Sequence, residues 1–220
     1  YAHDMYRPFH MRTQVDHRAD TRVLSLAIDD ARWLGRAWTP LVPDHGKLMH
    51  LFLVRDGGMD AIAHLHPVLR DSSHFECALP PLPAGLYRVY ADIVHESGFA
   101  QTLTDSVRVT DGGPAGPGAP NDGAWPAADP DDSWFAGRVT ADASGSVRCA
   151  LADGAVLVWE RGNVPLVERA EAPLRFRVLA ADGSVADIEP FLGMAGHAVL
   201  RSGDGAGFAH LHPIGSVAMA

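Results

Sequence analysis

Two short histidine motifs are the residues of this chain best suited to chemistry. The sequence reads IAHLHP from Ile62 to Pro67 and FAHLHP from Phe208 to Pro213. In an extended strand, residues i and i+2 share a face, so each motif places two imidazoles side by side. Neutral imidazole is the commonest metal donor in proteins and suits copper, zinc, nickel and iron. The repeated motif therefore indicates two candidate metal sites.

A third histidine precedes each motif at a nearly equal distance. A hairpin with its turn near Gly57 would place His50 opposite His64, on the face that His66 also occupies. The same arithmetic, with a separation one residue shorter, places His197 opposite His210. The sequence thus predicts one triad per half of the chain, formed by His50, His64 and His66 and by His197, His210 and His212.

Each predicted triad has the dimensions of a metal site. Facing Cβ atoms in an antiparallel pair lie about 4.5–5.5 Å apart. Imidazoles that reach inward from such positions can meet at an ion with bonds of about 2.0–2.1 Å. Two further residues are candidate ligands. Met194 could supply a soft thioether, which favours reduced copper, and His45 could supply a ligand or a supporting group from a loop.

The histidines could instead have a purely structural role. A single H-x-H motif in a strand is usually a pair of exposed or hydrogen-bonded side chains, and duplication could copy a structural pattern. In that case the histidines are packed or pH-sensitive groups of an interaction module that holds no metal.

The elements that must position these residues are short strands. Runs such as KLMHLFLV, GLYRVYADIV and AVLVWE are separated by Gly, Asp and Pro at the intervals typical of a β-sandwich. No segment has a sustained helical period. The sequence predicts an all-β fold of two tandem antiparallel sandwiches with an immunoglobulin-like outline.

A segment rich in Gly, Pro and Asp divides the chain. It predicts a first sandwich over 1–111, a linker over 112–132 and a second sandwich over 133–220. The second half stops soon after its AHLHP motif, whereas the first continues for several strands. Either segments are missing from the sequence or the second domain borrows strands from elsewhere.

Composition narrows the classes of partner. The net charge is −9, which argues against binding to nucleic acid, where affinity comes from neutralising phosphates. No run of 18 apolar residues appears, so no membrane span is predicted. Two cysteines among 220 residues make neither a disulfide scaffold nor a thiolate zinc site, whereas 12 histidines are available.

Signatures of common enzyme classes are absent from the sequence. There is no G-x-S-x-G elbow, phosphate-binding loop, dinucleotide fingerprint or H-E-x-x-H motif. An open tri-histidine site could still activate water or oxygen, as in cupin-type enzymes. A metal-dependent enzyme therefore remains the main alternative, although no acidic residue stands at a fixed place beside either H-x-H motif to act as a base.

The motifs also resemble a known group of proteins. The segments HGKLMHLFLVRDGGMDAIAHLHPV and LPPLPAGLYRVYADIVHESG resemble the YtkA-like bacterial extracytoplasmic domains, and ADIEPFLGMAGHAVLRSGDGAGFAHLHPIGSVAMA resembles a second domain of the same kind of secreted protein. The resemblance implies an immunoglobulin-like sandwich, export from the cytoplasm, and handling of copper or other heavy metals. By this resemblance, the residues of the two histidine triads and Met194 correspond to the metal ligands of the group. In the first half, Lys47 stands where a methionine would align.

These observations together predict an exported metal-binding protein. Copper is the first choice of metal and zinc the second, with capture, buffering or delivery to a partner protein as the role. An oxidising exterior favours histidine ligands, because thiolates would be lost there.

Overall fold

The computed structural model confirms the all-β prediction. It describes residues 8–18, 21–35, 40–110, 128–151, 153–163, 165–167 and 169–212. Nearly every regular element in these ranges is an antiparallel strand, and the exception is the short helix α2 (Ala31–Leu34). The more specific prediction of an immunoglobulin-like topology stays a prediction.

The chain divides into two compact units whose boundaries differ from the predicted ones. Unit 1 comprises Tyr1–Ala136 together with Ala198–His212, and unit 2 comprises Gly137–His197 together with Pro213–Ala220. The hairpin that carries the second H-x-H motif therefore belongs to unit 1. The predicted linker lies mostly outside the described residues, and only its last five residues, 128–132, are described.

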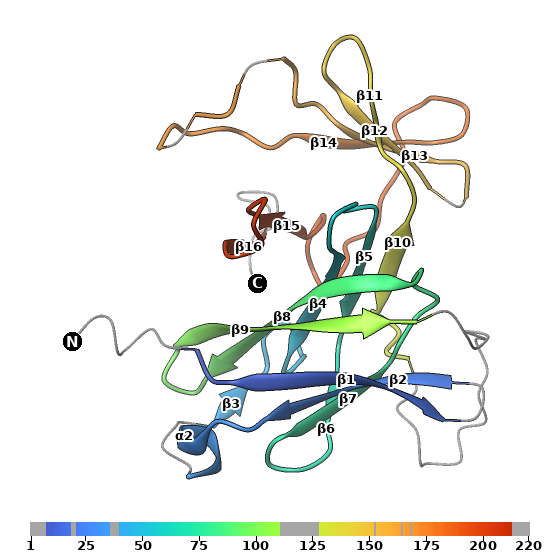
Figure 1. Ribbon diagram of the computed structural model, residues 1–220. Helices are drawn as coiled ribbons and strands as arrows, with labels where there is room; N and C mark the ends of the chain where they lie inside the picture. The colour runs from blue at the N-terminus through green and yellow to red at the C-terminus, as the bar shows by residue number, and fades with distance from the viewer. Residues whose placement is uncertain are drawn as a thin grey trace. The chain divides into compact units, whose positions relative to one another are not determined.

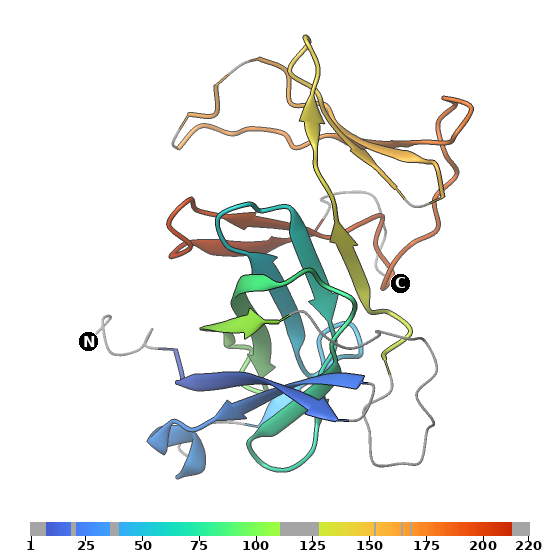
Figure 2. The same cartoon turned by 45° about the vertical axis from the view of Figure 1, so that its right-hand side comes forward.

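Unit 1 contains two large antiparallel sheets, whose strands run in colour from blue to yellow in Figures 1 and 2, and one sheet of two strands. One sheet has the order β1-β2-β7-β6, and the other has the order β10-β5-β4-β8-β3, with β9 also paired to β8. The strands of the first sheet are β1 (Met11–Arg18), β2 (Thr21–Ile28), β6 (Val68–Leu69) and β7 (His74–Ala78). Those of the second are β3 (Leu41–Val42), β4 (His50–Arg55), β5 (Ala61–Leu65), β8 (Gly85–His95), β9 (Ala100–Val109) and β10 (Ser133–Ala136).

Alternation along the strands decides which side chains form the main core. In β4, Leu51 and Leu53 point into the core, where Leu24, Leu26 and Phe75 from the other sheet meet them. Because successive side chains point to opposite faces, His50, Phe52 and Val54 face away from this core. All five residues from His50 to Val54 are nevertheless buried, so something must cover the outer face of β4.

The C-terminal hairpin supplies part of that cover. It consists of β15 (Ala198–Arg201) and β16 (Phe208–Leu211), drawn in red beside β4 and β8. Val199 and Phe208 pack on a small second cluster formed by Phe52, Val54 and Tyr90. The hairpin of the second half of the sequence therefore packs on the first sandwich.

The end of the predicted linker is also part of unit 1. Residues 129–132 form a turn that leads into β10, and β10 pairs with β5 so that Ser133 lies opposite His64. The strand β10 was predicted to open the second sandwich, but it extends the first one. This pairing places the last four linker residues beside the first H-x-H motif. They are Asp129, Pro130, Asp131 and Asp132.

Unit 2 contains a single four-stranded sheet among its described residues, with the order β11-β12-β13-β14. No helix among the described residues of the chain is long and apolar enough to cross a membrane. The strands of unit 2 are β11 (Thr140–Ala141), β12 (Val147–Ala150), β13 (Val156–Trp159) and β14 (Phe176–Leu179).

Candidate metal centre

The first histidine triad lies on the outer face of the β4–β5 hairpin, as predicted, but in a different register. Leu51 pairs with Leu65 and Phe52 pairs with His64, so the predicted pairing of His50 with His64 is wrong by two residues. The turn is longer on its β5 side, where Met59 takes a left-handed φ of 48°. A shift of two residues preserves the face of every side chain, which is why the triad still converges.

The three imidazoles are close enough to share an ion. One ring nitrogen from each of His50, His64 and His66 lies within 4.8 Å of the other two. Nδ1 of His50 is 3.0 Å from Nε2 of His64, which is near the separation of about 3.4 Å between two nitrogens on a tetrahedral ion. All three residues are buried, at 1%, 7% and 3% exposure respectively.

A backbone carbonyl fixes the orientation of His50. Nε2 of His50 lies 3.1 Å from the carbonyl oxygen of Asp44, to which it donates a hydrogen bond. In the neutral ring this places the lone pair on Nδ1, the nitrogen that faces His64. His50 is therefore held in the tautomer that a metal ligand needs.

A buried carboxylate fixes the orientation of His66. One oxygen of Asp132 accepts hydrogen bonds from the backbone N–H of His66 at 2.8 Å and from its Nδ1 at 3.1 Å. Nε2 of His66 is then left with a lone pair, and it is buried with no hydrogen-bond partner among the described residues. Carboxylate on one nitrogen and metal on the other is the usual arrangement of a metal-bound histidine.

An aromatic side chain stacks on the ring of His64. The ring of Phe52 stacks on His64 with centroids 4.3 Å apart and an interplanar angle of 14°. These two residues are direct partners across the β4–β5 ladder, so the stack follows from the register. It confines the ring of His64 to the plane in which Nε2 faces His50.

Acidic groups surround the centre and make it attractive to cations. Nζ of Lys47 lies 2.6 Å from Asp129 and 2.8 Å from Asp131, while Asp132 is taken by His66. Burial acts to lower the pKa of Lys47, but the hydrogen bonds to the two aspartates outweigh it and raise that pKa. Lys47 therefore stays charged and holds the end of the linker against β4, rather than lending a ligand.

His45 lies at the edge of the same centre. It sits in the turn between Asp44 and Lys47 with a left-handed φ of 47°. Its ring centroid is 6.4 Å from that of His50 and 5.1 Å from that of His212. The structure thus brings this predicted loop residue between the two histidine motifs.

The second H-x-H motif lies against the first. His210 pairs with Val199 across the hairpin, so the predicted pairing of His210 with His197 is wrong, again by two residues. The ring of His210 is 5.7 Å from His50 and 5.9 Å from His64 by centroid distance, and 4.6 Å from His212. The two motifs, predicted to occupy separate domains, meet on one face of unit 1.

The remaining predicted ligands lie in unit 2. His197 is the final residue of the first segment of unit 2, directly before β15, and Met194 pairs with Phe191 in an isolated bridge. Their membership of a metal site stays a prediction.

Burial favours the neutral form of two histidines, His50 and His212. It lowers the pKa of His50 from the ordinary value of 6.5, and the neighbouring His66 and His210 act in the same direction. It also lowers the pKa of His212, with His210 and His45 as further causes. A neutral imidazole has a lone pair for a metal, so the surroundings favour the form that binds one.

Sequence reasoning missed Asp129 and Asp132, and it could not place Asp92 at this centre. Asp132 lies in a segment read as linker, and Asp92, whose carboxylate is 3.4 Å from Nδ1 of His210, lies in β8. The register of β8 does place Asp92 opposite His50, but that pairing joins segments far apart in the sequence. A further possible ion-binding group, formed by His66, Asp129 and Asp132, involves the same missed residues.

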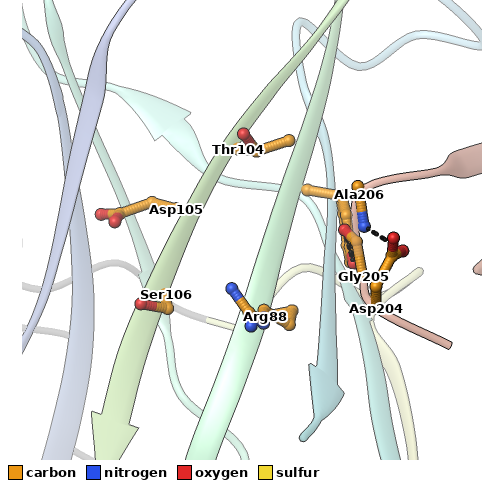
Figure 3. A pocket seen from close by; sticks show the side chains of 8 residues that line it. Arg88, Thr104, Asp105, Ser106, Asp204, Gly205 and Ala206 are labelled. Carbon is orange, nitrogen blue, oxygen red and sulfur yellow. Dashed lines mark hydrogen bonds between the residues drawn. The ribbon is translucent and has the colours of Figure 1, made fainter. Parts of the chain in front are cut away.

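A separate hollow of about 390 Å³ lies beneath the tip of the C-terminal hairpin. It is lined by polar groups of β8, β9 and the turn at 204–206, and Figure 3 shows Asp105 directed away from that turn. Asp105 accepts a hydrogen bond from the backbone N–H of Thr13 on the opposite side. The histidines do not line this hollow, so it is distinct from the candidate metal centre.

Comparisons with known proteins give one match. The profile of a domain family of unknown function, DUF8832, matches residues 150–219. This range includes His210 and His212 but not the first triad. No curated protein and no solved structure matches the chain.

Proposed function

We propose that this chain is an exported metal-binding protein whose principal site is formed by His50, His64 and His66. Copper is the metal that we propose first and zinc second, with capture, buffering or delivery to a partner protein as the role. The observation that carries the proposal is the buried Nε2 of His66, which has no hydrogen-bond partner among the described residues while Asp132 occupies Nδ1.

The cost of such an atom supports a ligand. A buried polar nitrogen without a partner costs about 1–3 kcal/mol, so folded proteins rarely retain one without a reason. A metal ion would satisfy it together with Nδ1 of His50 and Nε2 of His64, which already lie 3.0 Å apart. The aspartates nearby would offset part of the charge of the ion.

The donor type and the family resemblance guide the choice of metal and of location. Imidazole donors suit both copper and zinc, and the resemblance to YtkA-like domains favours copper and an extracytoplasmic place. Asp132 is the nearest carboxylate that could serve an enzyme as a base. Both of its oxygens accept hydrogen bonds, from His66 and from the backbone of Asp129, which favours a role in orienting a ligand over catalysis.

The test is a metal titration of the untagged full chain with Cu(I), Cu(II) and Zn(II), followed by equilibrium dialysis and metal analysis. The double variant His64→Ala, His66→Ala should lose the tightest equivalent. His17→Ala and His74→Ala together form the matched control, because these residues lie on β1 and β7 in the other sheet. Equal binding by the double variant and the wild type would refute the proposed site.

A further inference from the structure

The C-terminal hairpin docks on unit 1 through contacts that do not involve a metal. Phe208 stacks on Tyr90 with centroids 4.2 Å apart and contacts Phe52 at 5.5 Å. The hydroxyl of Tyr90 donates to the carbonyl of Gly205 at 3.0 Å. These contacts fix where β16 lies on the sheet.

A buried arginine fixes the orientation of the hairpin. Arg201 at the end of β15 has a side chain only 3% exposed, and it contacts Asp56 at 2.7 Å and the hydroxyl of Tyr90 at 3.1 Å. Arginine is rarely buried without a paired charge. The ion pair with Asp56 therefore allows Arg201 to be buried where the hairpin docks.

His210 follows Phe208 by two residues and therefore points to the same face of β16. With Phe208 seated on Tyr90, this face is directed at the first triad. The ring of His210 lies 4.8 Å from that of Phe52, which is also the support of His64. The docking contacts thus deliver one further imidazole to the metal centre.

We propose that His210 is a fourth ligand of the ion held by His50, His64 and His66, so that the bound ion ties the C-terminal hairpin to the sheet. This inference rests on the proposed function and adds a fourth ligand to the proposed metal site. Four imidazoles around a tetrahedral ion with bonds of 2.0–2.1 Å have ring centroids about 5 Å apart. The observed centroid distances are 4.6–5.3 Å within the triad and 5.7 and 5.9 Å from His210 to His50 and His64.

A carboxylate lies beside His210 as one lies beside His66. The carboxylate of Asp92 lies 3.4 Å from Nδ1 of His210, and the other nitrogen, Nε2, is buried. Asp92 also pairs with His50 across β4 and β8, so one strand pairing places the carboxylate near His210 beside a residue of the triad. A closed four-ligand site binds an ion for storage or structure, whereas an open three-ligand site leaves room for substrate.

The experiment uses the untagged full chain with Co(II), whose visible absorption is intense at four-coordinate tetrahedral sites and weak at higher coordination. Wild-type protein should show the intense bands. His210→Ala and His210→Gln should lose this intensity and bind Co(II) at least about 10-fold more weakly. Removing only a hydrogen-bond partner of a metal ligand already weakens metal binding by about 10-fold or more, and these variants remove a ligand itself. Retention of both spectrum and affinity in these variants would overturn the proposal.

A second pair of variants tests the docking without touching a ligand. Phe208→Ala should weaken Co(II) binding, because it removes the contacts with Tyr90 and Phe52 that seat His210. Leu200→Ala is the matched control, since Leu200 lies in the same hairpin and is 48% exposed. Equal affinities of the two variants would count against the proposal.

The outcomes separate this inference from the proposed function. If His64→Ala, His66→Ala abolishes binding while the His210 variants bind as wild type does, only the fourth ligand is refuted. If the His210 variants lose a whole equivalent while the remaining ion keeps its spectrum, His210 serves a different ion and the proposal is overturned. If wild-type protein binds no Co(II), Cu(II) or Zn(II), both proposals fail.

Discussion

At the scale of single residues, the candidate centre depends on which ring nitrogen of each histidine carries the proton. The carbonyl of Asp44 and the carboxylate of Asp132 take one nitrogen each from His50 and His66. The nitrogens that remain face the space between the rings. Histidine spacing in the sequence predicted the triad, but it could not predict these partners, because they come from a loop and from the end of a linker.

Removing the carboxylate beside His66 should weaken metal binding without removing a ligand. We expect Asp132→Asn to lower the affinity about 10–100-fold, because an amide no longer favours the Nδ1-protonated ring as strongly as a carboxylate does. Isothermal titration against Asp187→Asn, an exposed aspartate of unit 2, provides the comparison. An affinity equal to that of the control would show that Asp132 plays no part in binding.

The metal-free protein should lose stability as the pH falls below about 6.5. Burial lowers the pKa of His50 and of His212 in the folded state, whereas the unfolded chain takes up protons at the ordinary value of 6.5. Unfolding therefore binds protons in acid, and stability is complete above the unfolded pKa and declines toward the lower folded one. Urea unfolding in the presence of chelator, at several pH values between about 7.5 and about 5.5, measures this slope.

The control for this pH dependence is Val68→Ala, because Val68 is 48% exposed and has no titratable group. It should keep the wild-type slope, whereas His50→Gln should flatten it. A wild-type stability that stays constant across the range would contradict the assignment of a buried neutral histidine cluster.

At the scale of elements, the strands and their inward and outward faces could be predicted, but their registers and partners could not. Period-two alternation predicts that His50, His64 and His66 share one face of their hairpin, and this placement is confirmed. The turn after Arg55 contains two left-handed residues, Gly57 and Met59, and no sequence pattern signals the second one. Docking of β15 and β16 depends on contacts across more than one hundred residues, such as Arg201 with Asp56.

Strand β4 should be unusually sensitive to mutation on its outer face. Phe52 is 2% exposed and contacts His64, Phe208 and His210, so Phe52→Ala should lower the free energy of unfolding by about 3–5 kcal/mol. Val68→Ala in the same unit is the control, because Val68 is 48% exposed and should change stability by about 0.5 kcal/mol or less. A loss of under about 1 kcal/mol for Phe52→Ala would show that the hairpin does not cover this face in solution.

At the scale of the whole molecule, the chain forms two compact units, and unit 1 incorporates a hairpin from far along the sequence. The predicted halves of 1–111 and 133–220 do not coincide with the observed units, because β10 and the β15–β16 hairpin belong to unit 1. The repeated AHLHP motif suggested one site in each of two domains. Apolar residues on both hairpins, Phe52 and Phe208, instead bring the motifs to one face.

Metal should stabilise unit 1 through linkage. Free metal at 100 times its dissociation constant should raise the free energy of unfolding by about 2.7 kcal/mol, because the unfolded chain lacks the assembled site. Calorimetric melting with and without Zn(II), at pH above the ordinary pKa of histidine, checks this expectation. The same melting temperature in saturating metal and in chelator would contradict it.

Anomalous diffraction from crystals grown with copper or zinc tests the central claim most directly. We expect an anomalous peak about 2.0–2.1 Å from Nδ1 of His50, Nε2 of His64 and Nε2 of His66. An ion located elsewhere in the crystal, with these three nitrogens bound to protein groups or water, would contradict the account.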